Sequence, residues 1–194
     1  MAARPSGTAE VNLANNLTVL RILLTPVFIG SLIYYSPERS FFIYISIAAF
    51  LTACVTDGLD GLIARRLNQK TTLGSYIDPL ADKFLLLSAF SALSFMPNLP
   101  VSIRIPAWVT IIIITRDLLI LLGSILIFLT TGRLKAEPLF IGKLTTVFQM
   151  MALLASLIAA PDFIRHALFL AAVGLTAVSG LFYIRMGGRI LQSS

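Results

Sequence analysis

The chain has 194 residues, of which 57% are hydrophobic and only 12% are charged, and its formal net charge is +6. Soluble domains carry about 25% charged residues, so this composition excludes an ordinary soluble domain and predicts a single all-α integral membrane domain over residues 1–194. The positive charge does not indicate a nucleic-acid partner, because the basic residues are scattered among apolar runs and are not gathered on one face.

Six apolar segments follow one another along the chain, and a helix that crosses a membrane needs about 20 such residues. Turn-rich breaks separate several of them, at residues 36–39, 96–100 and 160–162. We therefore predict six transmembrane helices. Their approximate bounds are Leu17–Tyr35, Phe41–Arg65, Asp78–Phe95, Ile105–Thr131, Leu139–Ala160 and Ile164–Ile184.

The distribution of Lys and Arg predicts the orientation, because cytoplasmic loops carry an excess of these residues. With the N-terminus inside, three basic residues fall on the outer side, namely Arg39, Arg104 and Arg165. Eleven fall on the cytoplasmic side, namely Arg4, Arg21, Arg65, Arg66, Lys70, Lys83, Arg133, Lys135, Lys143, Arg185 and Arg189. We therefore expect both termini in the cytoplasm and the protein in the cell (inner) membrane.

Polar residues open the first segment. Asn16 and Thr18 both suit the N-cap of a helix, and both could also reach a ligand. Arg21 lies further on, inside the apolar run, where a charge needs an anionic partner or a route to the membrane surface. Arg21 is therefore a candidate for binding phosphate.

A pair of carboxylates ends the second segment. Asp57 and Asp60 lie one turn apart on a helix, so they share a face. Gly61 and Ala64 lie on the same face and leave room for a phosphate or a nucleotide to approach the backbone. Arg65, at the edge of this face, can bind phosphate oxygens through two N–H groups.

A second pair, Asp78 and Asp82, lies at the start of the third segment. Two facing pairs would form an oxygen cage that suits a hard divalent cation, or two such cations about 4 Å apart. From Phe41 to Asp57 a helix rises by about 24 Å. In a hydrocarbon core about 30 Å thick, the carboxylates then lie at its cytoplasmic edge, where a lipid substrate and a soluble one can meet.

Further charges interrupt the fourth and fifth segments. Because adjacent residues on a helix point about 100° apart, we expect Arg116 not to pair with Asp117 and to face a polar cavity. The candidates for binding the phosphate of a small acceptor are Arg21, Arg116 and Lys143. The alternative is that these side chains snorkel to the membrane surface or pair between helices. The sixth segment shows no polar stripe, so we expect it to serve packing or lipid contact.

The stretch from Asp57 to Asp82 resembles the signature of the CDP-alcohol phosphatidyltransferase family, D-x2-D-G-x2-A-R-x8-G-x3-D-x3-D. Eight fixed residues at fixed spacing make a far more specific signal than a lone pair of aspartates. The matching residues are Asp57, Asp60, Gly61, Ala64, Arg65, Gly74, Asp78 and Asp82.

The resemblance implies transfer of a phosphatidyl group from CDP-diacylglycerol to an alcohol, with release of CMP, by a homodimer in the lipid bilayer. It implies two Mg²⁺ or Mn²⁺ ions on the four aspartates, and Asp82 also as the general base for the attacking hydroxyl. The residues that it implies for the CDP site are Asn16, Thr18, Asp60, Gly61, Ala64, Arg65 and Gly74.

Two further elements bear on the acceptor alcohol. Residues 15–26 resemble the N-L-T-x2-R-x4-P opening of the phosphatidylglycerophosphate synthase branch, and residues 142–149 resemble its G-K-x-K-T-x2-Q element, with Leu144–Thr145 in place of x-K. Both favour glycerol 3-phosphate. However, Arg116–Asp117 stands where that branch more often has Arg-Glu, and residues 138–146 also resemble the cardiolipin synthases of the family. Cardiolipin synthesis from phosphatidylglycerol is therefore the alternative.

Two other classes of protein are weaker alternatives. A membrane prenyltransferase also uses Asp-rich motifs and magnesium on helices, but it should show two separated motifs on a longer chain with more spans. A non-catalytic channel or scaffold can hold buried charges, but it does not need glycine and alanine at the signature spacing. The enzyme interpretation is retained.

Overall fold

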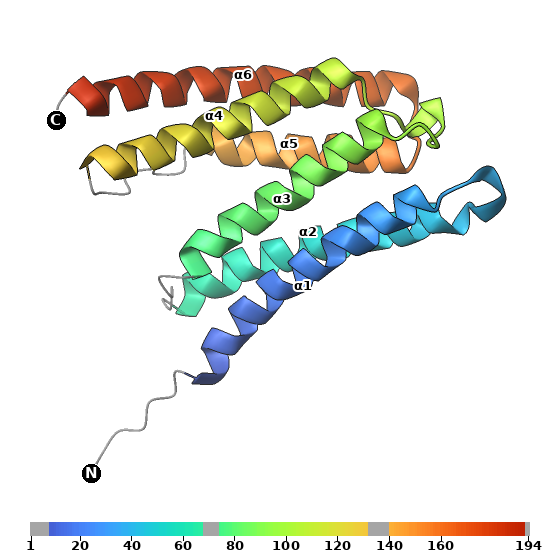
Figure 1. The fold of residues 1–194 in the computed structure, drawn as a ribbon, viewed down its shortest axis with the longest axis horizontal. Coiled ribbons are helices and arrows are strands. Elements are labelled where there is room, and N and C mark those ends of the chain that lie inside the picture. The colour runs from blue at the N-terminus through green and yellow to red at the C-terminus, as the bar shows by residue number, and fades with distance from the viewer. Residues whose placement is uncertain (1–7, 68–73, 132–139, 193–194) are drawn as a thin grey trace, which may run out of the picture. The chain divides into compact units, whose positions relative to one another are not determined.

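The structure is a computed structural model, drawn in Figure 1. It describes the backbone of residues 8–67, 74–131 and 140–192, and the side chains of residues 19–56, 83–123, 141–183 and 185. Within these ranges every regular element is a helix, which confirms the all-α prediction for the described residues.

Six α-helices and two short 3-10 helices follow one another in the described ranges: α1 Thr8–Ile33, η1 Pro37–Arg39, α2 Phe41–Leu67, α3 Gly74–Phe95, η2 Val101–Ile103, α4 Ala107–Thr131, α5 Phe140–Leu157 and α6 Asp162–Gln192. They divide between two compact units. Unit 1 holds α1, α2 and most of α3, and unit 2 holds α4, α5, α6 and the last residues of α3.

The first helix begins earlier than predicted, at Thr8 and not near Leu17. Residues 8–14 include two alanines, a leucine and a glutamate, which favour helix, so α1 extends through them. Asn16 and Thr18 therefore lie inside α1, and the expectation that they cap this helix was wrong. Three further bounds differ from the prediction: α3 begins at Gly74 and not near Asp78, α5 ends at Leu157 and not near Ala160, and α6 continues beyond Ile184 to Gln192.

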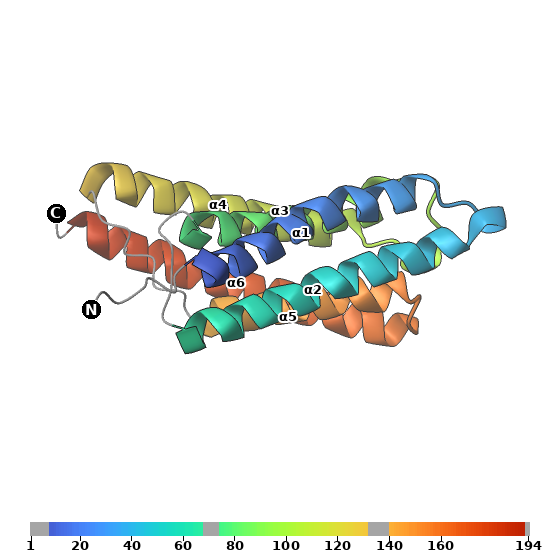
Figure 2. The same ribbon diagram turned by 90° about the horizontal axis from the view of Figure 1, so that it is seen from below.

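In unit 1, α1 packs against α2, and the two helices run side by side in both Figure 1 and Figure 2. Phe28 and Phe50 meet in the core with their ring centroids 6.0 Å apart. The hydroxyls of Ser31 and Ser46, both buried, share a hydrogen bond of 2.6 Å between the helices. The side-chain amide of Asn98 donates to three carbonyls at the end of α1, and so caps it.

In unit 2, α6 packs against both α4 and α5. Ile113 of α4, Leu153 of α5 and Phe169 of α6 are buried in its core. Arg165 of α6 donates to the backbone carbonyl of Ser102 and thereby ties η2 to the start of α6. These contacts hold the three long helices of unit 2 in register.

Hydroxyl side chains inside the helices bond the carbonyl of the residue one turn earlier. This arrangement suits an apolar surrounding, where an unpaired hydroxyl would be costly. The residues that show it are Thr25, Ser46, Thr52, Thr56, Thr145, Thr146 and Thr176.

Two helical stretches, Val101–Gly123 and Asp162–Tyr183, are long and apolar enough to cross a membrane by length and composition. Shorter apolar helices in the described residues are Val19–Ile33, Phe41–Thr56, Lys83–Phe95 and Ile141–Leu157. The prediction of six spans and of cytoplasmic termini stays a prediction.

Candidate active site

The signature residues lie on two consecutive helices of unit 1. They are Asp57, Asp60, Gly61, Ala64 and Arg65 on α2, and Gly74, Asp78 and Asp82 on α3. Since both segments are α-helical, the two members of each aspartate pair lie about one turn apart. The side chains of all eight lie outside the described residues, so the convergence of the two pairs stays a prediction.

The buried face of α2 leads toward the first pair. Its buried positions recur every three or four residues: Ser46, Ala49, Phe50, Ala53 and Thr56. At the same spacing, the continuing helix reaches Asp57, Asp60 and Ala64. The first aspartate pair therefore falls on the extension of a face that the protein keeps buried.

The same holds for the other two helices of unit 1. The buried positions of α3 include Leu85, Leu86 and Ala89, and their spacing leads back to Asp82 and Asp78. In the described part of α1, from Val19 on, the buried positions are Arg21, Thr25, Phe28, Ser31 and Leu32. Their spacing leads back to Thr18, whereas Asn16 falls outside it. A site enclosed by these helices requires its residues to fall on the buried faces, and this spacing meets that requirement.

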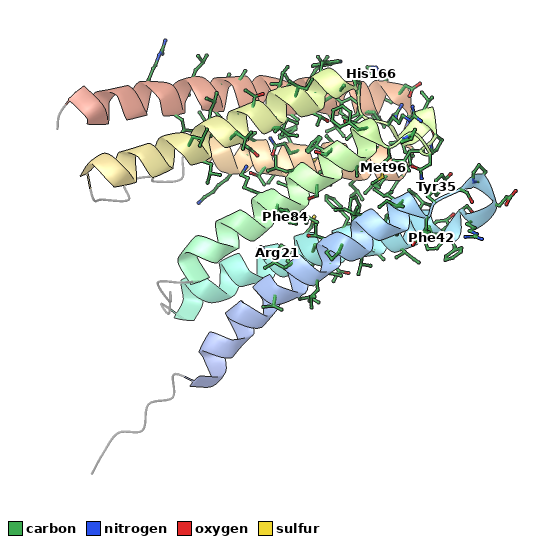
Figure 3. All side chains as sticks on the ribbon, in the orientation of Figure 1. Arg21, Tyr35, Phe42, Phe84, Met96 and His166 are labelled. Atoms are coloured by element: carbon green, nitrogen blue, oxygen red, sulfur yellow. The ribbon has the colours of Figure 1, made fainter. Side chains whose placement is uncertain are left out.

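Arg21 is itself almost fully buried, at 1% exposure, and Figure 3 labels it on α1. It belongs to unit 1, whereas Arg116 and Lys143 belong to unit 2. The three residues predicted to bind the acceptor therefore come from both units.

Arg116 of α4 is the centre of a buried polar cluster in unit 2. Its Nη1 donates to Asp117 Oδ1 at 2.7 Å, and its Nη2 donates to Ser179 Oγ. Its Cζ lies 5.8 Å from the centroid of the Tyr183 ring. The expectation that Arg116 and Asp117 do not pair was wrong, because the long arginine side chain can bend around its helix and a buried charge without a partner is costly.

Two glycines leave room for this cluster. A Cβ atom at Gly180 would lie 3.4 Å from Arg116 Cγ. A Cβ atom at Gly142 would lie 3.7 Å from Tyr183 Oη and 3.8 Å from Arg116 Nη2. Backbone of α5 and α6 therefore borders the arginine directly, and a large side chain at either position would press on it.

Lys143 follows Gly142 on α5, and its side chain is exposed. Because adjacent residues on a helix point about 100° apart, Lys143 is directed away from the side of α5 that borders Arg116. The structure thus places Lys143 beside the Arg116 cluster and not within it.

A polar stripe on α6 escaped the sequence analysis. Thr176, Ser179 and Tyr183 recur at helical spacing, and the first two are fully buried. Gln149 of α5, also fully buried, donates to Thr176 Oγ1 at 3.3 Å. The expectation that the sixth segment has no polar stripe was wrong; the spacing of its hydroxyls is the signal that its high content of Phe and Leu concealed.

Among the described residues, no group of three or more His, Cys, Asp or Glu side chains could hold a metal ion. Two of the described carboxylates are already paired, Asp117 with Arg116 and Asp162 with Arg165. The four signature aspartates, whose side chains lie outside the described residues, stay the predicted donor set for the metal site.

Paired aspartates on consecutive helices of a strongly apolar chain mark a candidate metal site, because ionisable residues in apolar segments are costly and hard divalent cations prefer oxygen ligands. The family model for CDP-alcohol phosphatidyltransferase matches residues 11–178 of this chain. The chain therefore belongs to the CDP-alcohol phosphatidyltransferase family.

Curated relatives match over most of their length. The chain is 36% identical over 184 residues to a protein of Mycobacterium tuberculosis named probable phosphatidylglycerophosphate synthase, with 92% of this chain and 83% of that protein covered. It is 34% identical over 201 residues to a protein of Bacillus subtilis named CDP-diacylglycerol–glycerol-3-phosphate 3-phosphatidyltransferase, with 94% and 98% covered. A protein of Aquifex aeolicus with the latter name is 32% identical over 146 residues, with 75% of each chain covered.

Proposed function

We propose that this protein transfers the phosphatidyl group of CDP-diacylglycerol to glycerol 3-phosphate and releases CMP, as a step of phospholipid biosynthesis. The observation that carries this proposal is the complete family signature on two consecutive helices of one unit. The names of the relatives, which cover most of both chains, support glycerol 3-phosphate as the acceptor.

The family generally uses divalent metal ions. Four carboxylates fit this requirement by their chemistry, since hard cations such as Mg²⁺ prefer oxygen ligands. Asp57, Asp60 and Asp78 would be the main ligands, with Asp82 near a second ion. When bound, Mg²⁺ or Mn²⁺ would neutralise the pyrophosphate and stabilise the charge that develops on the leaving CMP.

The remaining work falls to protein groups near the reacting phosphorus. Asp82 would accept the proton of the acceptor's attacking hydroxyl. The oxygen of that hydroxyl would then form a bond to the phosphatidyl phosphorus as the bond from phosphorus to CMP breaks. Gly61, Ala64 and Gly74 would let the CDP moiety approach the backbone, and Arg65 would bind its phosphate oxygens. Asn16, Thr18 and Asp60 complete the proposed CDP site.

The acceptor's phosphate would lie against Arg116. Asp117 already offsets the charge of this arginine, so Arg21 and Lys143 would supply the additional positive charge that a phosphate requires. The exposed position of Lys143 suits a residue that meets a soluble acceptor as it arrives.

The same proposal covers the surroundings of the enzyme. We expect one catalytic domain over residues 1–194 with six spans in the inner membrane, both termini in the cytoplasm and the active site at the cytoplasmic surface. The family resemblance also favours a homodimer. Labelling of single cysteines placed in the loops of a Cys54→Ala chain, from either side of sealed vesicles, would test the orientation.

The decisive experiment compares acceptors. Purified protein in detergent, with CDP-diacylglycerol and Mg²⁺ or Mn²⁺, is offered glycerol 3-phosphate or phosphatidylglycerol separately, and CMP release is followed. We expect turnover with glycerol 3-phosphate alone, and none in an Asp82→Asn variant that keeps its helical content.

Turnover with phosphatidylglycerol alone would instead make the protein a cardiolipin synthase. Turnover with neither acceptor would leave the family membership in place and contradict the proposed acceptor. Equal loss of activity and of helical structure in Asp82→Asn would contradict the catalytic role of Asp82.

A further inference from the structure

The guanidinium of Arg116 keeps part of its hydrogen-bonding capacity free. It has five N–H donors, and the structure gives acceptors to one on Nη1 and one on Nη2. Its Nε is buried and has no hydrogen-bond partner in the part of the chain that the structure describes. A buried, charged donor group that is only partly satisfied has donors left for an anionic ligand.

The partners of Arg116 lie on two different helices, and this decides which of them can hold its guanidinium in place. Asp117 follows Arg116 on the same helix, so their ion pair moves with α4. Ser179 and Tyr183 come from α6, and Ser179 is fully buried and cannot swing into solvent. Among the described residues, these two are the ones whose side chains fix the guanidinium with respect to a second helix.

The glycines show how closely that second helix approaches. The backbone at Gly180, between Ser179 and Tyr183, borders the arginine stem, and Gly142 borders both Nη2 and the tyrosine hydroxyl. The guanidinium therefore has little freedom to rotate while the contacts to α6 persist.

We propose that Ser179 and Tyr183 are positioning residues, which hold the Arg116 guanidinium so that its free donors meet the phosphate of the acceptor. The proposal rests on the proposed function, and it makes α6 part of the acceptor site although α6 carries no signature residue. Loss of either contact should weaken binding of the phosphorylated acceptor and leave CDP-diacylglycerol binding intact.

The chain offers a matched control one turn away. Thr176 lies on the same helix as Ser179, is equally buried, and also accepts a hydrogen bond from a side chain of another helix. Its donor is Gln149 and not Arg116. Thr176→Val and Ser179→Ala therefore remove comparable contacts between helices, but only Ser179→Ala releases the arginine.

The test measures KM for glycerol 3-phosphate, KM for CDP-diacylglycerol and kcat in the purified enzyme and in these variants. We expect Ser179→Ala to raise KM for glycerol 3-phosphate by about tenfold, as for a lost hydrogen bond to a charged group, with KM for CDP-diacylglycerol unchanged. Tyr183→Leu should raise it by about fivefold, whereas Tyr183→Phe, which keeps the ring, should stay within about twofold. Thr176→Val should not shift it.

Unchanged KM for glycerol 3-phosphate in both Ser179→Ala and Tyr183→Leu would overturn the positioning role, and so would an equal rise in Ser179→Ala and Thr176→Val. The wild-type enzyme separates this failure from a failure of the proposed function. If it shows no turnover with glycerol 3-phosphate, both proposals fall; if it turns over and the variants behave alike, only the positioning role falls.

Discussion

Two of the described arginines of unit 2, Arg116 and Arg165, are buried, and their charges are compensated by different kinds of partner. The side chains of Arg116 and Arg165 are 8% and 7% exposed, and each pairs with a carboxylate and with one further oxygen. The partners of Arg165 are Asp162, whose side chain is 81% exposed, and the backbone carbonyl of Ser102. The partners of Arg116 are Asp117, at 2% exposure, and the buried hydroxyl of Ser179.

We propose that this difference separates an arginine with a structural role, Arg165, from one that binds the acceptor, Arg116. Any residue at position 102 would offer the backbone carbonyl that Arg165 bonds, and an ion pair open to water contributes little to stability. Arg165 therefore serves as a structural link between η2 and the start of α6. Arg116 is surrounded by specific side chains and two glycines inside the unit. Burying this many polar groups destabilises a protein more than an apolar core would, and clusters of this kind are typical of binding sites.

The largest expected effect comes from removing the two arginines in turn. Arg116→Ala should lower kcat/KM for glycerol 3-phosphate by at least about a hundredfold, because the phosphate loses a charged donor group. Arg165→Ala should change it by less than about threefold. Steady-state CMP release measures both, and similar losses in the two variants would abolish the distinction between them.

Removal of the charge on Asp117 or on Asp162 should lower the free energy of unfolding by different amounts. Asp117→Asn leaves a buried guanidinium without its counter-charge, and we expect a loss of about 3 kcal/mol, or roughly 6–12 °C in Tm. Asp162→Asn, at an exposed pair, should cost less than about 1 kcal/mol. Thermal unfolding in detergent, followed by circular dichroism, compares them; a larger loss in Asp162→Asn would contradict the ranking.

The contacts of Arg165 should contribute moderately to the free energy of unfolding. Arg165→Ala removes the link between η2 and α6 and the packing of a buried stem, so we expect a loss of about 2 kcal/mol. The same unfolding measurement tests it, with Arg39→Ala, at an exposed position, as the control. An Arg165→Ala protein as stable as this control would show that the contacts around Arg165 hold nothing in place.

The smallest effect concerns glycine. A methyl group at Gly142 would make ordinary contacts with Arg116 and Tyr183, whereas at Gly174 nothing lies within 4 Å. We expect Gly142→Ala to raise KM for glycerol 3-phosphate by about twofold and Gly174→Ala to leave it unchanged, while alanine favours both helices by up to about 1 kcal/mol. A greater change of KM in Gly174→Ala would place the sensitive surface elsewhere.

Helices, breaks and the signature could be predicted from sequence because they depend on local patterns. The apolar segments and the turn-rich breaks give the order of the helices, and the spacing of Asp57, Asp60, Asp78 and Asp82 fixes their register once the segments are helical.

What could not be predicted depends on neighbours in space. The pairing of Arg116 with Asp117 follows from burial by α6, which no spacing on α4 reveals. Ser179 and Thr176 are common residues whose meaning comes from the side chains of α4 and α5 that they meet. The start of α1 was missed because Asn16 resembles a cap, although the residues before it continue the helix.

The most direct test of the central claim identifies the lipid product when both acceptors are offered together. Purified enzyme receives CDP-diacylglycerol, a divalent cation, glycerol 3-phosphate and phosphatidylglycerol, and mass spectrometry follows the lipids formed. We predict phosphatidylglycerophosphate as the product in the wild-type enzyme, strongly reduced in Arg116→Ala and retained in Arg165→Ala. Cardiolipin as the main product, or an equal yield in the two arginine variants, would contradict the account.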